Sequence, residues 1–163
     1  MVRKSSVLIP AIIAAVAIGA LGLAFVPPDV RQNSLQFPKG TVKVGNDVIT
    51  VDIAHSDAEK QRWLTFRQDK LSFDHAMLIK YDQQDLYQVW MLNIQYNLDL
   101  AWFNQNGTAV YLIKNAAPCQ NLVESFSCTY KTTKPAMYIL ASTAGFAQQH
   151  SIVLGSKMTI ISA

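Results

Sequence analysis

Hydrophobic and polar positions alternate along most of the chain after residue 40, and this pattern predicts β-strands. In TVKVGNDVITVDIA (41–54), valines alternate with polar residues on both sides of Gly45-Asn46-Asp47, which is typical of a β-hairpin. Asn106-Gly107 is a favoured two-residue hairpin turn. Further strands are predicted in AMLIKY (76–81), YQVWMLNI (87–94), NLDLAWF (97–103), TAVYLIKNA (108–116), AMYILAS (136–142) and KMTIISA (157–163).

Two short segments interrupt the strand pattern. SDAEKQRWLTF (56–66) begins with Ser56 and places Glu59 three residues later, which is a capping box, where each side chain accepts a hydrogen bond from the other residue's backbone N–H. TAGFAQQH (143–150) predicts a second short helix. The sequence therefore predicts one mainly β domain at residues 41–163, an antiparallel β-sandwich or barrel with one or two short helices.

The first 28 residues differ in composition from the rest and predict a membrane anchor or signal segment. Residues 7–26 form an uncharged run of 20 residues, close to the length that crosses a hydrocarbon core of ~30 Å. Arg3 and Lys4 precede this run and place the amino terminus in the cytoplasm, so residues 29–163 are expected outside. A cleaved signal peptide is the alternative, because Gly22-Leu23-Ala24 is a small-x-small pattern. Residues 29–40 are predicted to be a linker.

The charge of the chain bears on which partners it can bind, and its cysteines bear on whether it contains a disulfide. Beyond the leader, 12 Lys and Arg residues stand against 11 Asp and Glu residues, without a basic cluster, which argues against a nucleic-acid partner. The two cysteines, Cys119 and Cys128, are nine positions apart in a loop-like segment. An even count in an exported domain favours a disulfide. A zinc-type site is the weaker alternative, because no further ligand lies nearby in sequence.

The apolar run VWMLNIQYNLDLAWF (89–103) carries polar residues that require partners if the strand is buried. Strand alternation places Asp99 on the face of Ala101 and Phe103. One interpretation is structural, with Asp99 accepting hydrogen bonds from Arg62 or Arg67. The other is a catalytic carboxylate whose pKa is raised by burial. The candidate ligand-binding residues are Arg62, Arg67, Trp90, Asn93 and Asp99, although for Asp99 the structural interpretation is favoured.

The remaining candidate groups give weaker signals. Trp90, Met91, Met77 and Trp102 lie in predicted strands, where a place in the core is the first expectation. His55, His75 and His150 show no metal-ligand spacing, so no metal or other cofactor is predicted, although copper coordination by Met and His is kept as an alternative. The sequence contains no phosphate loop and no Gly-x-Ser-x-Gly elbow.

The order of several motifs from about residue 42 to the end identifies a resemblance. The motifs are QRWLTFRQDKL, HAMLIKY, VWMLNIQYNLDLAWF, a Pro-Cys pair, KPAMYIL and AGF. In this order they resemble the domain of unknown function 192 family, small and often exported domains of bacteria and archaea. The residues that carry the resemblance are Arg62, Leu64, Arg67, Met77, Leu78, Trp90, Met91, Asn93, Leu98, Asp99, Pro118, Cys119, Pro135, Tyr138, Leu140, Gly145 and Phe146.

The resemblance implies a compact, mostly β fold and no established activity. The chain departs from the family at Trp63 and Ala76, where Gly is usual, at Ile94 for Thr, at Asn97 for Pro and at Ala141 for an acidic residue. A shared chemistry that required the Thr hydroxyl or the carboxylate would therefore be absent from this chain.

Together these observations predict a membrane-anchored, single-pass protein whose outer domain binds a ligand or a partner, as an accessory or assembly component without catalysis of its own. A protein partner would be expected among membrane proteins. The enzymatic alternative is a small hydrolase or transferase that uses Asp99 with Asn93 and Arg62 or Arg67.

Overall fold

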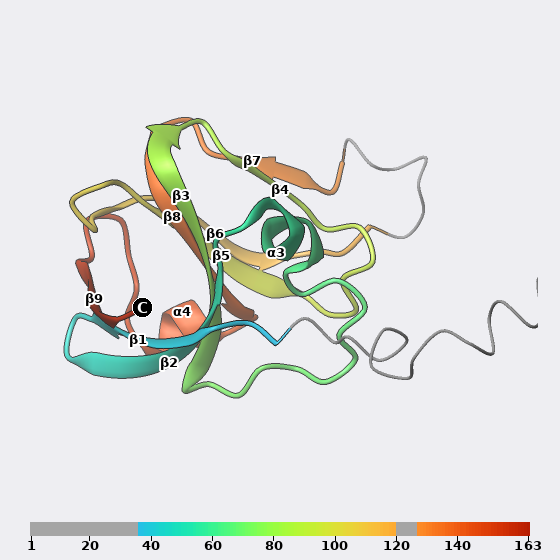
Figure 1. Cartoon of the computed structure of the whole chain (residues 1–163), viewed down its shortest axis with the longest axis horizontal. Helices are drawn as coiled ribbons and strands as arrows, with labels where there is room; N and C mark the ends of the chain where they lie inside the picture. The colour runs from blue at the N-terminus through green and yellow to red at the C-terminus, as the bar shows by residue number, and fades with distance from the viewer. Residues whose placement is uncertain (1–35, 120–126) are drawn as a thin grey trace, which may run out of the picture. The chain divides into compact units, whose positions relative to one another are not determined.

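The structure, a computed structural model, describes residues 36–119 and 127–163. These residues form nine strands and two helices, so the prediction of a mainly β fold with one or two short helices is confirmed. The elements are β1 (Lys39–Val44), β2 (Asp47–Ala54), α3 (Asp57–Arg62), β3 (His75–Asp85), β4 (Gln88–Trp90), β5 (Leu98–Phe103), β6 (Ala109–Ala116), β7 (Thr129–Lys131), β8 (Ala136–Thr143), α4 (Phe146–Gln149) and β9 (Met158–Ser162) (Figure 1).

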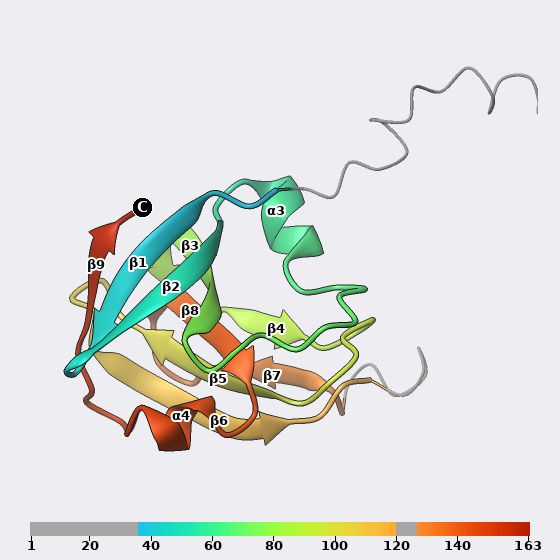
Figure 2. The ribbon, with the colours of Figure 1, turned by 90° about the horizontal axis from the view of Figure 1, so that it is seen from below.

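Seven strands form one open, curled sheet in the order β6-β5-β8-β3-β2-β1-β9 (Figure 2). Its strand pairs are antiparallel except β2 and β3, which are parallel, so the prediction of a purely antiparallel sheet is wrong at this pair. A parallel pair requires a long crossover, and residues 55–74 with α3 supply it. The segment before β6 also meets the start of β9, because the Met158 N–H donates to the Gly107 carbonyl at 2.7 Å.

The two faces of the sheet cover two separate hydrophobic clusters. Leu98, Leu100 and Trp102 of β5 belong to one cluster, together with Trp63 and Leu64 after α3. The intervening Ala101 and Phe103 belong to the other, with Phe146 and Ala147 of α4. The alternation predicted for residues 97–103 is therefore confirmed, and the segment after α3 and helix α4 contribute to different clusters.

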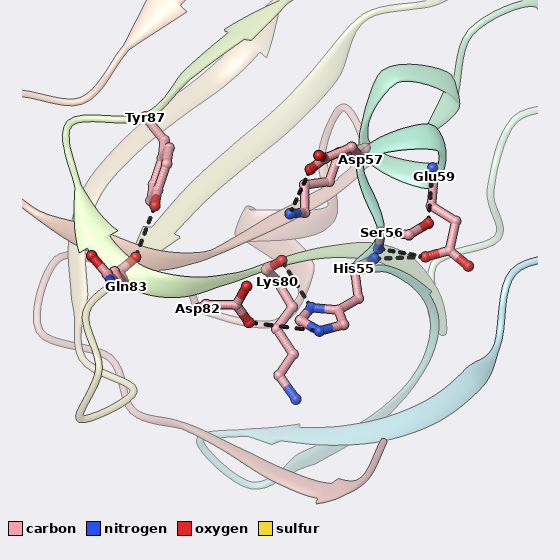
Figure 3. A network of polar contacts seen from close by, with 9 residues as sticks. His55, Ser56, Asp57, Glu59, Lys80, Asp82, Gln83 and Tyr87 are labelled. Carbon is pink, nitrogen blue, oxygen red and sulfur yellow. Dashed lines mark hydrogen bonds and ion pairs between the residues drawn. The ribbon is translucent and has the colours of Figure 1, made fainter.

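The capping box predicted at the start of α3 is present. The Glu59 carboxylate accepts hydrogen bonds from the N–H groups of Ser56 at 2.8 Å and His55 at 3.0 Å, and the Ser56 hydroxyl accepts from the Glu59 N–H (Figure 3). The His55 and Ser56 amides lower the pKa of Glu59 below its usual value. This contribution to stability is present above the usual pKa and is lost as the pH falls through the lowered one. His55 also contacts Asp82 at 3.6 Å, which links the end of β2 to β3.

The predicted strand at residues 87–94 is much shorter in the structure. β4 pairs with β7 in a separate two-stranded sheet and ends at Trp90, and residues 91–97 lie outside the named strands. A turn closes here, because the Ile94 N–H donates to the Met91 carbonyl. Met77, Met91 and Trp102 are buried as predicted, but Trp90 is 45% exposed, because its buried neighbour Val89 occupies the inward position of the short strand.

Both predicted hairpins, β1–β2 and β5–β6, are present, but the loop of the second is longer than two residues. Val44 pairs with Asp47, so Gly45 and Asn46 form a two-residue turn between β1 and β2. Between β5 and β6 the turn at Asn106-Gly107 belongs to the longer segment from Asn104 to Thr108, because Phe103 pairs with Ala109. The Asn104 side-chain carbonyl accepts hydrogen bonds from the N–H groups of Asn106 and Thr108 and holds this loop.

Cys119 and Cys128 form the predicted disulfide, with Cα atoms 5.2 Å apart. Cys128 is buried in the cluster that also contains Met91, and the Cys128 carbonyl accepts a hydrogen bond from the Met91 N–H at 3.1 Å. The disulfide therefore fastens the chain beside the 91–97 loop.

Replacing both cysteines with alanine is expected to lower the free energy of unfolding by about 2–3 kcal/mol, because the nine-residue separation closes a short loop in the unfolded chain. Denaturant melts of the oxidised wild type and the double variant measure this difference. Wild-type protein treated with reductant should melt with the double variant. Coincident melts of the variant and the oxidised wild type would contradict the expectation.

The predicted membrane helix at residues 7–26 lies outside the described residues. Within residues 36–119 and 127–163, no helix combines the length and the apolar character needed to cross a bilayer.

Candidate functional site

Asp99 is buried and fully engaged by backbone amides. Its side chain points from β5 toward α4 and is 3% exposed. One carboxylate oxygen accepts from the Asn115 N–H at 2.8 Å, and the other accepts from the N–H groups of Gly145 at 3.0 Å and Ala147 at 2.9 Å. Gly145 is the N-cap of α4 and has no side chain of its own to cap the helix, so Asp99 supplies that cap from another strand.

Asp99 was expected to accept hydrogen bonds from Arg62 or Arg67, and for Arg67 this expectation is wrong. Arg67 points to the opposite face of the sheet, where its Nη1 lies 3.5 Å from Asp52 Oδ2 and its Nε donates to the Asp69 carbonyl at 3.2 Å. Three backbone donors already satisfy the Asp99 carboxylate, which explains how a charged group is tolerated in a buried strand. This geometry favours the structural interpretation of Asp99.

Asn97 and Asn115 extend the Asp99 contacts to the neighbouring loops. The Asn97 side-chain amide donates to the Asn115 side-chain carbonyl at 2.9 Å, and the Asn97 backbone carbonyl accepts from the Ala144 N–H at 3.1 Å. Asn115 has a φ of 57°, a left-handed conformation that asparagine tolerates better than most residues. The polar residues at 97 and 99 thus hold the ends of β6 and β8 beside β5.

Asn93 lies in the loop after β4, which is hydrogen-bonded to the loop after α3. Each of these two loops contains a residue in the left-handed conformation. Asn93 has a φ of 59° and Phe66 a φ of 62°. The Phe66 N–H donates to the Asn93 carbonyl at 2.9 Å, which joins the loop after α3 to the loop after β4. Phe66 is 67% exposed. A left-handed phenylalanine is unusual and strained, and such strain often marks a functional site.

The two joined loops bring four of the five predicted ligand-binding residues onto neighbouring segments. Residues 62–67 and 90–93 are called here the loop-pair surface. Arg62 is exposed at the end of α3, and the Thr65 N–H and hydroxyl both donate to its carbonyl, which tightens the turn that leads to Phe66. Arg67 follows Phe66 directly, and Trp90 stands three residues before Asn93. Asp99 is the predicted site residue that lies elsewhere, on the other sheet face.

A second polar cluster, which meets the loop-pair surface at Arg67, was not predicted from the sequence. Asp52 of β2 is buried, and its Oδ2 lies 3.5 Å from Arg67 Nη1 and 3.1 Å from His75 Nε2. The sequence did contain a signal. In the strand DVITVDIA, Asp52 alternates with the buried Val51 and Ile53 and occupies the face of Ala54, where a carboxylate needs a partner.

Two buried polar atoms near this cluster have no hydrogen-bond partner in the part of the chain that the structure describes. One is His75 Nε2, whose short contact with Asp52 lacks hydrogen-bond geometry, and the other is the Tyr96 hydroxyl. Tyr96 is 6% exposed. Burial raises the pKa of its phenol, while the nearby Arg67 charge and the Leu71 backbone amide, which faces the phenol oxygen, oppose that rise. Unpartnered buried polar atoms are uncommon in folded proteins and require an explanation.

The three histidines occupy separate places. His55 contacts Asp82, His75 contacts Asp52, and His150 contacts Asp47 at 2.8 Å and the Phe73 carbonyl at 2.5 Å. Among the described residues, no group of three or more His, Cys, Asp or Glu side chains is arranged to hold a metal ion.

Comparison with known proteins finds one family whose model matches most of the chain. A family model described as "Uncharacterized ACR" (DUF192) matches residues 40–160. No curated protein matches the chain.

Two solved structures share the fold. One is a candidate transcription regulator from Sinorhizobium meliloti 1021, 20% identical with a TM-score of 0.69, and the match covers 78% of this chain and 98% of that one. The other is a protein of unknown function from Novosphingobium aromaticivorans, 21% identical with a TM-score of 0.68, and the match covers 78% of this chain and 89% of that one. At these identities the likeness concerns the fold alone.

Proposed function

The chain belongs to the Uncharacterized ACR family (DUF192), and on that premise we propose that it is a membrane-anchored domain that binds a partner through the loop-pair surface on the outer face of the membrane. The observation that carries the proposal is the pair of joined left-handed residues, Phe66 and Asn93, which present a strained and 67% exposed phenylalanine beside Arg67. In this proposal the domain carries out no catalysis.

The composition of the loop-pair surface suits binding. Phe66 and Trp90 are exposed aromatic residues, and Arg62 and Arg67 flank Phe66 in the chain. Aromatic residues and arginine are enriched at protein interfaces and dominate their binding energy. The hydrogen bond between Phe66 and Asn93 fixes one loop against the other, which lowers the entropy lost on binding.

Two features support a location outside the cytoplasm. The uncharged run at residues 7–26, preceded by Arg3 and Lys4, has the length and charge pattern of an anchor with a cytoplasmic amino terminus. The Cys119–Cys128 disulfide is a feature of proteins in oxidising compartments. Amino-terminal sequencing of the mature protein checks the anchor, since a chain that starts near Phe25 would be a soluble exported domain.

The other candidate functions receive less support from the same contacts. A hydrolase or transferase that uses Asp99 would need an accessible carboxylate, whereas three backbone amides occupy this one. A copper-handling role would need Met and His ligands in one place, and the three histidines contact three different aspartates.

Site-specific photo-cross-linking of the full chain in its native membrane tests the proposed surface. A photoreactive phenylalanine analogue is placed at position 66 or, as matched controls, at Val48 and Leu154, which are 60% and 62% exposed. A discrete cross-linked product from position 66 that neither control gives is expected. Equal products from all three positions, or none from position 66, would contradict the proposal.

A further inference from the structure

The two cysteines of the disulfide are hydrogen-bonded to both backbone groups of Met91. The Met91 N–H donates to the Cys128 carbonyl at 3.1 Å, and the Met91 carbonyl accepts from the Cys119 N–H at 3.2 Å. The Met91 side chain is 0% exposed and packs in the same cluster as Cys128. Because the disulfide joins the two hydrogen-bond partners of Met91 to each other, it fixes the position of Met91.

Met91 lies inside the loop-pair surface, between Trp90 and Asn93. Two residues after Met91, the Asn93 carbonyl accepts from the Phe66 N–H at 2.9 Å. Asn93 and Phe66 have left-handed φ values of 59° and 62°, and such conformations persist only where the surrounding structure holds them. A continuous series of backbone contacts therefore leads from the disulfide through Met91 and Asn93 to Phe66.

A short sheet also supports this segment. β4 and β7 pair over three residues each, and Trp90 at the end of β4 lies opposite Thr129, the residue after Cys128. A two-stranded sheet is at best marginally stable on its own in water. Loss of the disulfide should therefore loosen Met91 and the Trp90 end of β4 before it loosens the large sheet.

We propose that the Cys119–Cys128 disulfide regulates the loop-pair surface, which is ordered for binding in the oxidised protein and loosened in the reduced protein. This inference rests on the proposed binding function and names the regulation of that site. A surface that is ordered beforehand loses less entropy when its partner binds, so reduction should weaken binding.

The covalent step is thiol–disulfide exchange with a second protein. When the bond forms, the thiols of Cys119 and Cys128 lose two protons and two electrons, and the disulfide of an oxidising protein takes them up and becomes a dithiol. In the reverse direction, a thiolate of a reducing protein attacks the Cys119 sulfur and Cys128 leaves as a thiolate. A second thiol of the reducing protein then releases Cys119. The attack is placed at Cys119 because it is partly exposed, whereas Cys128 is 4% exposed.

Amide hydrogen exchange of the full-length protein, oxidised and treated with dithiothreitol, tests the coupling at a temperature where both forms are folded. The Ala147 amide, which donates to Asp99 in the other cluster, is the reference. Relative to it, the Met91 and Phe66 amides should exchange about tenfold faster or more after reduction, since local opening needs less free energy than global unfolding. Equal acceleration of all three amides would overturn the inference, because it would show a general loss of stability alone.

Gly107→Ala is the matched control for stability. This substitution is expected to destabilise the oxidised fold through the contact with Met158 while leaving the disulfide intact. In this variant the Met91 and Phe66 amides should accelerate no more than the Ala147 amide. A preferential acceleration of Met91 and Phe66 as large as that in the reduced protein would overturn the inference.

Cross-linking from position 66 tests the effect on binding. The yield should fall about tenfold or more after reduction, because loosened loops must be ordered again when the partner binds, and it should recover after treatment with oxidised glutathione. The double variant Cys119→Ala/Cys128→Ala should give the low yield with and without reductant. A double variant that cross-links as well as the oxidised wild type would overturn the inference, and a fall of its yield on reduction would assign the sensitive disulfide to the partner.

The cross-linking results separate the regulation from the proposed function. If the yield from position 66 is the same in both redox states, the regulation fails and the proposed function stands. If position 66 gives no product in either state, the proposed function and its regulation are both rejected.

Discussion

Replacing Asp99 with alanine is expected to lower the free energy of unfolding by about 3–5 kcal/mol, because each buried donor left without an acceptor costs about 1–3 kcal/mol. The Asn115, Gly145 and Ala147 amides would lose their acceptor together. The start of α4 and the end of β6 should then loosen. Denaturant melts of the full chain measure the effect.

Two further variants sharpen the Asp99 experiment. Asp99→Asn keeps the size of the side chain but turns an N–H₂ group toward backbone N–H donors. The Asp99→Asn protein should therefore lose a large part of the free energy of unfolding that Asp99→Ala loses. Asp82→Ala removes a carboxylate that is 79% exposed and should change stability by about 0.5 kcal/mol or less. An Asp99→Ala melt at or above the wild-type midpoint would refute the structural role.

Replacing Gly107 with alanine is expected to destabilise the fold by about 3 kcal/mol or more, among the larger effects of a single substitution. Gly107 has a φ of 67°, and an added Cβ would lie 2.1 Å from the backbone carbonyl oxygen of Met158. Because that oxygen is main chain, the strand must move. The hydrogen bond from the Met158 N–H at the start of β9 to the Gly107 carbonyl before β6 would be lost.

Gly45→Ala is the matched control for this prediction. Gly45 has a φ of 61°, and an added Cβ would have no neighbour within 4 Å. It should therefore show the conformational penalty alone, about 1–2 kcal/mol. The difference between the two melts measures the contact with Met158. Equal destabilisation by the two substitutions would show that this contact contributes nothing.

Local patterns predicted much of the fold. Ser56 and Glu59 form their capping box within four residues, and the alternation of residues 97–103 fixes which side chains face each cluster. The disulfide was predicted from an even cysteine count together with the expectation that the domain is exported. Each of these features depends on neighbours in sequence or on composition, so the sequence was sufficient for them.

Contacts between distant segments were not predictable in the same way. Periodicity does not specify whether neighbouring strands run parallel, so the β2–β3 pair was missed. The donors to Asp99 are backbone amides at residues 115, 145 and 147, and every residue type offers such an amide. The sequence could show that Asp99 needs partners but could not identify them.

The candidate site was predicted only in part for related reasons. Arg62, Arg67, Trp90 and Asn93 were selected together, and the Phe66–Asn93 hydrogen bond explains why their segments are neighbours. Phe66 was missed because a left-handed φ at phenylalanine contradicts local preference. Asp52 and His75 were missed because their contact depends on the parallel pairing of β2 and β3.

We propose that Asp99 stabilises the fold and that the loop-pair surface binds the partner. The direct test is the cross-linking yield from position 66 in Arg67→Gln and Asp99→Asn backgrounds, at a temperature below both melting transitions. We expect Arg67→Gln to lie within about 1 kcal/mol of the wild type in stability, because the ion pair of Arg67 with Asp52 is partly exposed. The same substitution should abolish the cross-link. Asp99→Asn should melt early yet keep the cross-link. A cross-link that survives Arg67→Gln and disappears in folded Asp99→Asn would contradict both assigned roles.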